Sequence, residues 1–233
     1  RRDRAEWHAR AIIQNGLGRV LHDETDTENH ECQNQHGGEL GKIAIDLDES
    51  AIHWTGRNLL NKHFGTLKIS EGWIECVDGI ATAGRFTIDM KSMHCDDLDG
   101  DPSHDILIAH LESDDFFDVS KFPSAEFVLR KASPIPHAHE GQNNLRIEGE
   151  LEMKSHAIPI AFQGAFGVTP DGKAAVQASL PIDRTLWGVI YGSGQFHARI
   201  GMHLVNDLID IELMKKSPED RREHFNNAYD LPE

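Results

Sequence analysis

The sequence contains little cysteine, few basic residues and no long hydrophobic run. Apolar residues make up 39% of the 233 residues, and no run of them approaches the roughly 18 to 20 residues of a membrane-spanning helix. Membrane insertion is therefore not expected. Only 23 lysines and arginines face 39 aspartates and glutamates, which gives a net charge of -16. A surface this acidic repels phosphate backbones and anionic lipid surfaces, so nucleic-acid binding is not expected either.

The sequence also lacks the short motifs that mark common enzyme classes. It has no hydrolase nucleophile elbow, no glycine-rich phosphate loop and no dinucleotide-binding fingerprint. Gly16 and Gly18 stand close together, but no third glycine and no preceding strand accompany them. The carboxylates of Asp96 and Asp97 are adjacent in sequence, and in an extended chain such neighbours point apart. The sequence therefore predicts a protein that is not an enzyme.

The three cysteines, Cys32, Cys76 and Cys95, are too few for a disulfide framework. An odd number leaves at least one thiol outside an internal disulfide unless it bonds another chain, so a homodimer remains an alternative to a monomer. Cys76 and Cys95 could pair across neighbouring strands, although sequence alone does not place their Cβ atoms.

Alternation of apolar and polar residues is the main pattern that the sequence does contain, and it begins near Lys42. Turn residues at Gly72, Asp78–Gly79 and Pro170–Gly172 interrupt it. About eight or nine strands at hairpin spacing with little helix favour an all-β antiparallel barrel or sandwich. The alternating segments are Ile43–Leu47, Phe64–Ile69, Trp73–Val77, Ile80–Met90, Ala125–Leu129, Leu145–Met153, Ile158–Val168, Val176–Ile182 and Ile209–Leu213.

The two ends of the chain differ from this β-rich middle. Near the N-terminus a few apolar residues at helical spacing precede a long polar run. Near the C-terminus, Ser217 is a good N-cap and Pro218 suits the first helical position, which predicts a short helix. We therefore expect an N-terminal arm at 1–38, a barrel domain at 39–216, and a C-terminal helix and tail at 217–233.

The most informative stretch of the sequence is residues 110–127, which read His-Leu-Glu-Ser-Asp-Asp-Phe-Phe-Asp-Val-Ser-Lys-Phe-Pro-Ser-Ala-Glu-Phe. Phe116, Phe117 and Phe122 stand among aspartates that we expect to remain in water, and Pro123 biases Phe122 toward an extended backbone. This stretch resembles a segment that marks the YceI-like family of lipocalin-type isoprenoid-binding proteins. Further segments match the family pattern in the same order, namely Ser50–Gly56, His63–Thr66, Gly84–Met93, Leu145–Met153 and Asp183–Val189.

The resemblance implies an extended eight-stranded antiparallel lipocalin-like barrel, with short helices at the termini and in the 110–120 crossover. It further implies a periplasmic or secreted protein that binds and carries a lipophilic long-chain molecule, such as an isoprenoid, a quinone-like tail or a fatty amphiphile. About ten methylene groups, at about 0.8 kcal/mol each, supply micromolar binding after ordering costs. Inward small residues such as Gly84, Gly149 and Gly164 are expected to leave volume for this chain.

The expected ligand-binding residues are the large side chains of the alternating strands and of the crossover, together with an arginine. Arg184, or alternatively Arg85, is expected to meet a polar head group at the mouth of the barrel. The whole predicted set is Trp54, Phe64, Phe86, Ile88, Phe116, Phe117, Phe127, Ile147, Leu151, Phe162, Phe166, Arg184 and Trp187.

The alternative function is a histidine-dependent metal-binding, haem-binding or redox protein built on the same barrel. The chain has 15 histidines, and His30, Cys32 and His36 place three metal-ligand types close together. His197 and His203 stand where the family resemblance predicts a more aromatic and polar stretch. A metal ion or haem belongs to this alternative only, since the carrier function requires no cofactor.

Two other sets of polar residues match metal-site patterns only in part. His53 and His63 lie near the turns expected at the mouth of the barrel, where a satisfied or surface histidine is the default interpretation. The aspartate-rich loop that begins at Asp97 resembles a calcium loop, but its twelfth position is Ile108 where an EF-hand requires glutamate. This loop is therefore expected to be solvated.

Overall fold

The computed structural model describes residues 42–48, 50–77, 80–139, 142–168, 174–196 and 204–215. All of them belong to one compact unit, Glu31–Glu233. The expected N-terminal arm and C-terminal helix lie outside the described residues, so the division of the chain into three parts stays a prediction.

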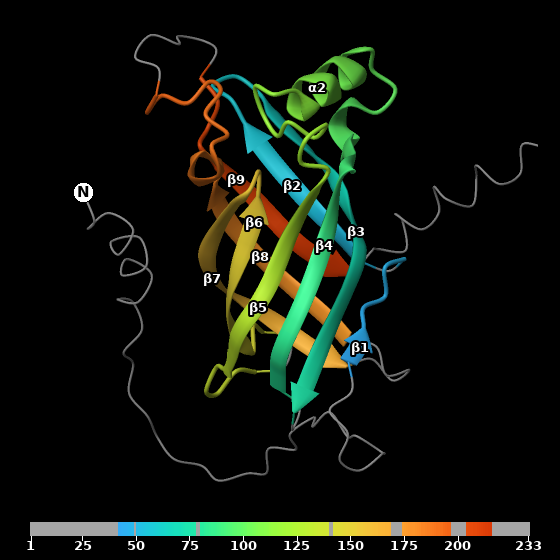
Figure 1. Cartoon of the computed structure of the whole chain (residues 1–233), viewed down its shortest axis with the longest axis vertical. Helices are drawn as coiled ribbons and strands as arrows, with labels where there is room; N and C mark the ends of the chain where they lie inside the picture. Colours follow the sequence, from blue (N-terminus) through green and yellow to red (C-terminus); the bar gives the residue numbers. More distant parts are fainter. Residues whose placement is uncertain are drawn as a thin grey trace, which may run out of the picture. The chain divides into compact units, whose positions relative to one another are not determined.

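Eight of the strands in the described residues close into an antiparallel barrel, which confirms the predicted fold (Figure 1). Around the barrel the order is β2, β9, β8, β7, β6, β5, β4 and β3, and β3 pairs with β2 to close the circle. The short strand β1 extends the wall beside β3. The bounds are β1 (Lys42–Ala44), β2 (Ser50–Arg57), β3 (Lys62–Val77), β4 (Ile80–Cys95), β5 (Ser124–Pro134), β6 (Leu145–Met153), β7 (His156–Val168), β8 (Ala174–Asp183) and β9 (Leu208–Lys215).

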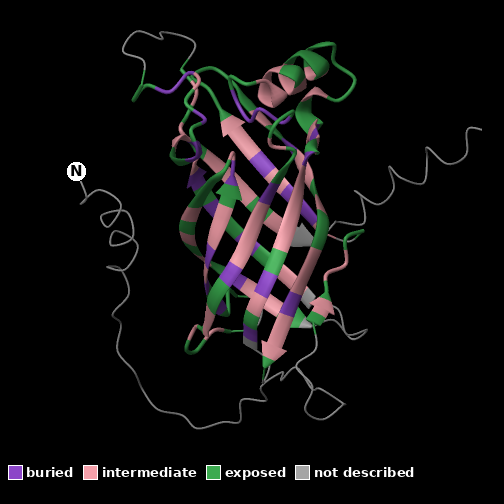
Figure 2. Cartoon of the chain, viewed as in Figure 1, coloured by how far each residue is buried: buried purple, intermediate pink, exposed green. Residues whose placement is uncertain are grey.

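Helix α2 (Ser103–Glu112) follows β4 and lies at the barrel end opposite the β3–β4 hairpin (Figure 1). The helix begins earlier than the expected crossover helix, and residues 113–122 form turns rather than helix. At its C-terminus the Ser113 N–H donates to the His110 carbonyl oxygen at 3.2 Å. None of its residues is fully buried, whereas the strands and the loops at this end of the barrel both contain buried positions (Figure 2).

The turns after α2 direct Phe116 and Phe117 toward the barrel interior. Phe116 and Phe117 are buried, as the sequence pattern predicts. Asp118 was expected to remain in water, but it is only 8% exposed and has a positive φ of 49°. Its carboxylate accepts hydrogen bonds from Lys121 Nζ at 2.7 Å and Ser120 Oγ at 3.2 Å. The hydrogen bond from Lys121 is the main reason that the pKa of Asp118 lies below its usual value.

The long β3–β4 ladder contains three register shifts that the alternation of the sequence does not reveal. Gly72 was predicted to be a turn, but β3 continues through it. Near the hairpin, a shift between Glu75 and Cys76 turns Ala81 rather than Thr82 toward the lumen. Side chains along a strand alternate between its two faces. Beyond each shift, the residues that simple alternation places on the outside therefore face the lumen, and those that it places inside face outward.

Gly149 on β6 allows an aromatic ring from the neighbouring strand to lie against the backbone. A Cβ at this position would lie 2.3 Å from Phe127 Cζ and 2.6 Å from the Val128 carbonyl oxygen. Gly149 was expected to leave open volume for a ligand. This expectation is wrong, because Phe127 fills the space beside Gly149.

The substitution Gly149→Ala is expected to lower the free energy of unfolding by about 1 to 3 kcal/mol, because the new methyl group displaces Phe127 and strains the backbone. Gly167→Ala on β7 is the matched control, since a Cβ there would meet no atom within 4 Å. Urea unfolding of both variants measures the difference. Equal stabilities would contradict the close contact between Gly149 and Phe127.

Candidate ligand-binding cavity

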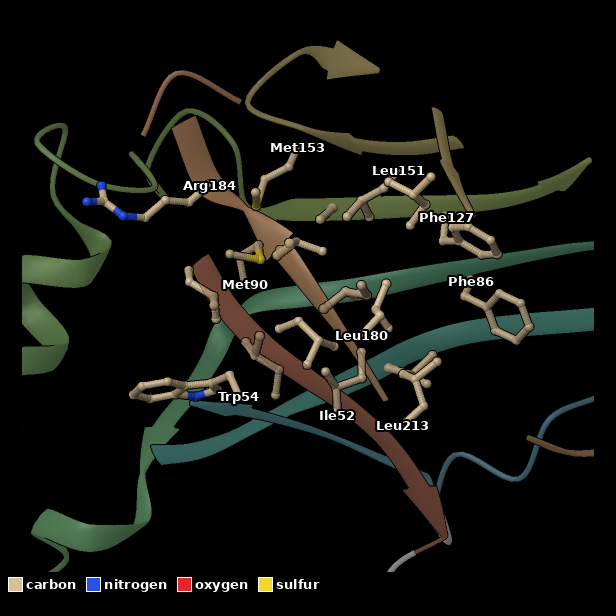
Figure 3. Close-up of a pocket in the computed structure, with 18 of the residues that line it drawn as sticks. Ile52, Trp54, Phe86, Met90, Phe127, Leu151, Met153, Leu180, Arg184 and Leu213 are labelled. Atoms are coloured by element: carbon tan, nitrogen blue, oxygen red, sulfur yellow. The ribbon is translucent and has the colours of Figure 1, made fainter. Parts of the chain in front are cut away.

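The barrel encloses an apolar cavity of about 510 Å³, a size typical of small-molecule sites (Figure 3). Side chains from all eight barrel strands line it. At the β3–β4 hairpin end the wall includes Ile74 and Ala81, and at the α2 end it includes Leu107 and Phe116. The cavity therefore extends along the barrel, which suits an elongated apolar molecule.

Most of the side chains predicted to contact a ligand lie on the wall of this cavity. Phe64 does not, because it occupies an outward position of β3 and is 41% exposed. Trp187 is buried but is not part of the wall, and its Nε1 donates to the Leu151 carbonyl oxygen at 3.0 Å. The predicted residues on the wall are Trp54, Phe86, Ile88, Phe116, Phe117, Phe127, Ile147, Leu151, Phe162, Phe166 and Arg184.

Several wall residues were missed by the sequence interpretation. Leu180, Ile211 and Leu213 belong to alternating segments, so the pattern that predicted the strands could also have identified them. His110 and Tyr191 had no such signal, because they reach the cavity from α2 and from the segment after η2 (Arg184–Trp187). The His110 ring packs edge-on against Tyr191, with ring centroids 4.6 Å apart.

Trp54 brings an unpaired hydrogen-bond donor to the cavity wall. The residue is 9% exposed, and its Nε1 is the one buried side-chain nitrogen or oxygen without a hydrogen-bond partner among the described residues. Leaving such a donor unsatisfied costs about 1 to 3 kcal/mol. Trp54 lies toward the same end of the cavity as Arg184 and Met90, away from Phe86 and Phe127 (Figure 3).

Arg184 is fully buried and its guanidinium already has several partners. Its donors reach the carbonyl oxygens of Val189 at 2.7 Å, Asn206 at 3.0 Å and Val205 at 3.2 Å, and the Asp207 carboxylate at 3.5 Å. Burial lowers the pKa of Arg184, and the negative charge of Asp207 opposes this effect. The guanidinium therefore stabilises the segment that ends the barrel, and few of its donors are left for a ligand head group.

The metal ligands predicted from the sequence, His30, Cys32, His36, His197 and His203, lie outside the described residues and stay predictions. The alternative pairing of Cys76 with Cys95 does not occur. These two residues lie at opposite ends of the β3–β4 ladder, where Cys76 faces Ala81 and Cys95 faces Gly65.

The family model of the YceI-like domain matches residues 44–215, which is more than half of the chain. The chain belongs to the YceI-like family. The resemblance inferred from the sequence is thus confirmed. No match was found among the curated proteins with which the sequence was compared.

Two solved structures resemble this YceI-like protein over most of its barrel. BcnA of Burkholderia cenocepacia is 21% identical, with 72% of this chain and 96% of that chain covered and a TM-score of 0.56. A polyisoprenoid binding domain from Saccharophagus degradans is 11% identical, with 75% and 96% covered and a TM-score of 0.54. At these identities the likeness shows a shared fold. Within the described part of the YceI-like protein, no helix is long and apolar enough to cross a membrane.

Proposed function

We propose that this YceI-like protein binds a lipophilic molecule with a long hydrocarbon chain in its barrel and sequesters or carries it. The apolar cavity of about 510 Å³ is the observation that carries the proposal. The Saccharophagus degradans domain with the same fold is described as polyisoprenoid binding, which supports this ligand class. Isoprenoids, quinone-like tails and fatty amphiphiles all belong to the class, and none of them requires catalysis by the protein.

The physical basis of binding is burial of the chain against aliphatic and aromatic side chains. About ten buried methylene groups contribute roughly 8 kcal/mol, before the cost of ordering the ligand is subtracted. The rings of Phe86, Phe127 and Phe162 form a connected group at one part of the wall. The ring centroid of Phe127 lies 6.2 Å from that of Phe86 and 5.8 Å from that of Phe162. Such a wall selects for apolar character and length rather than for a particular branching pattern.

We further propose that the polar end of the ligand lies near Trp54. A carbonyl or hydroxyl oxygen placed there accepts the hydrogen bond that Trp54 Nε1 lacks. The hydrocarbon chain then runs past Leu180 toward Phe86 and Phe127 (Figure 3). This orientation places the head group at the barrel end beside α2 and the tail toward the β3–β4 hairpin.

Native mass spectrometry of freshly purified protein, followed by extraction of the bound molecule, tests the proposal directly. We expect an apolar long-chain compound, and titration of the stripped protein with such compounds should restore one bound molecule per chain. Protein that carries no lipid and fails to displace an apolar dye with any long-chain compound would contradict the carrier function.

The substitution Trp54→Phe tests the proposed position of the head group. The wild-type protein is expected to prefer a long-chain ketone over the alkane of equal length by about five- to tenfold, which corresponds to one hydrogen bond of about 1 to 1.4 kcal/mol. The variant should lose this preference, because the buried ketone oxygen then has no donor that replaces its hydrogen bonds to water. Dye displacement measures the two affinities, and an unchanged preference would show that the head group lies elsewhere.

We also propose that the protein acts in the periplasm or outside the cell, as the family resemblance implies. Its excess of acidic over basic residues gives an acidic surface, which limits adsorption to anionic lipid while a ligand is exchanged. Fractionation of cells that express the protein from its full natural gene tests this location.

A further inference from the structure

Three side chains of metal-ligating types converge at the barrel end where β4 leads into α2. His63 lies near the start of β3, Cys95 ends β4, and Asp97 lies in η1 (Asp96–Leu98). One nitrogen, one sulfur and one oxygen from these residues all lie within 4.8 Å of one another. His63 Nδ1 is 2.9 Å from Asp97 Oδ2, and Cys95 Sγ is 3.3 Å from Asp97 Oδ1.

The backbone around this cluster holds the side chains in position. Gly65 pairs with Cys95, and a Cβ on Gly65 would lie 1.9 Å from the His94 carbonyl oxygen. Glycine therefore allows β3 to approach β4 closely at this point. The Phe64 N–H donates to Asp97 Oδ1 at 2.8 Å and orients the carboxylate. Ligands held in position in this way lose less conformational freedom when they bind an ion.

His104 on α2 supports Cys95 from the other side. The Cys95 N–H donates to His104 Nε2 at 3.4 Å, so this ring nitrogen is an acceptor. His104 Nδ1 lies 3.0 Å from Asp105 Oδ1, and His104 Nε2 also lies 3.1 Å from His94 Nδ1. His104 thus acts as a positioning residue for Cys95, in the manner of the outer partners that orient metal ligands.

The cluster is buried at its sulfur and open to solvent at its other two ligands. Cys95 is fully buried, whereas the side chains of His63 and Asp97 are 28% and 19% exposed. Burial, and then the hydrogen bond to Asp97, raise the pKa of the Cys95 thiol to about 12. Burial alone would raise the pKa of Asp97, but hydrogen bonds from Phe64, His63 and Cys95 lower it overall. An incoming cation reaches the imidazole and the carboxylate from this solvent-exposed side.

We propose that His63, Cys95 and Asp97 form a binding site for a borderline divalent metal ion, of which Zn²⁺ is the best match. Imidazole nitrogen, thiolate sulfur and carboxylate oxygen are together the ligand types that Zn²⁺ prefers. Three protein ligands leave the fourth tetrahedral position for water. The net charge of -16 also raises the local concentration of cations. This metal site goes beyond the proposed lipid binding and does not depend on it.

Titration of the chelator-treated full-length protein with Co²⁺, a spectroscopic probe for zinc sites, tests the proposal. We expect a thiolate-to-cobalt charge-transfer band that saturates at one ion per chain and disappears when Zn²⁺ is added. Cys95→Ser should abolish the band, whereas Cys76→Ser and Cys32→Ser, the two matched cysteine controls, should keep it. A band that survives in Cys95→Ser, or that is lost in Cys32→Ser, would overturn the proposal, as would the absence of any thiolate band.

The other two ligands are tested by affinity rather than by colour. Asp97→Asn keeps an oxygen that accepts the Phe64 N–H and so preserves the local fold, but it removes the anionic ligand. Because the loss of an outer partner alone weakens metal sites by about 10- to 100-fold, we expect the loss of this ligand to weaken Zn²⁺ binding at least a hundredfold. His63→Ala should act similarly. Unfolding midpoints of the metal-free variants verify folding, and wild-type Zn²⁺ affinity in folded Asp97→Asn and His63→Ala would contradict the site.

Discussion

Replacing Leu180 with tryptophan is expected to weaken long-chain ligand binding by about a hundredfold. Leu180 on β8 lies on the cavity wall between the Trp54 end and the Phe86 end (Figure 3). The larger indole occupies room that about four methylene groups of the ligand would otherwise fill, and their burial is worth about 3 kcal/mol. Because the ring enters a cavity rather than a packed core, we expect the barrel to remain folded. Dye displacement by the long-chain ligand measures the change.

Leu208→Trp provides the matched control for this effect. Leu208 lies on the adjacent strand β9 and is 47% exposed, so the same chemical change occurs outside the lumen. The control variant should bind the ligand as tightly as the wild-type protein. If Leu180→Trp also bound normally while remaining folded, the ligand would not occupy the lumen and the carrier function would be wrong.

Replacing Arg184 with methionine is expected to have the largest effect on stability, a loss of about 3 to 5 kcal/mol in the free energy of unfolding. The guanidinium is fully buried and donates to three backbone carbonyl oxygens, those of Val189, Val205 and Asn206. A methionine fills much of the volume but leaves these acceptors, and the Asp207 carboxylate, without their donor. Urea unfolding measures the loss.

Two comparisons separate this role of Arg184 from a general effect of removing positive charge. Arg146→Met removes an exposed arginine that pairs with Glu148, and exposed ion pairs are worth only about 0 to 1 kcal/mol. Arg184→Lys keeps the charge but cannot reach several carbonyls from one planar group, so it should restore little of the lost stability. Wild-type stability in Arg184→Met would show that the buried hydrogen bonds contribute nothing to the fold.

The alternation of the sequence predicted the strands of one half of the barrel well. In β6 the residues Leu145, Ile147 and Leu151 face the lumen as expected, since the pairing of this hairpin is regular. The turn between β6 and β7 consists of Lys154 and Ser155, which both have positive φ, and Met153 pairs with His156. Non-glycine residues in such a turn have no strong sequence signal.

The other half of the barrel shows where such a pattern stops being reliable. The register shifts of the β3–β4 ladder turn Ala81 inward, and neither residue type nor spacing marks them. The wall residues on α2 were missed for a different reason. Leu107 and His110 reach the cavity because the barrel end is covered by this helix, which no local pattern relates to the lumen.

The sequence by itself determined that the chain forms an antiparallel barrel of the YceI-like family, carries an acidic surface and lacks the motifs of common enzymes. These properties depend on local alternation, composition and ordered motifs, which are written along the chain. Only the tertiary structure decided that Trp54 has an unpaired donor at an apolar cavity and that Gly149 is covered by Phe127. It alone brought His63 beside Cys95 and Asp97. Such contacts depend on strand register and barrel closure, which no single segment specifies.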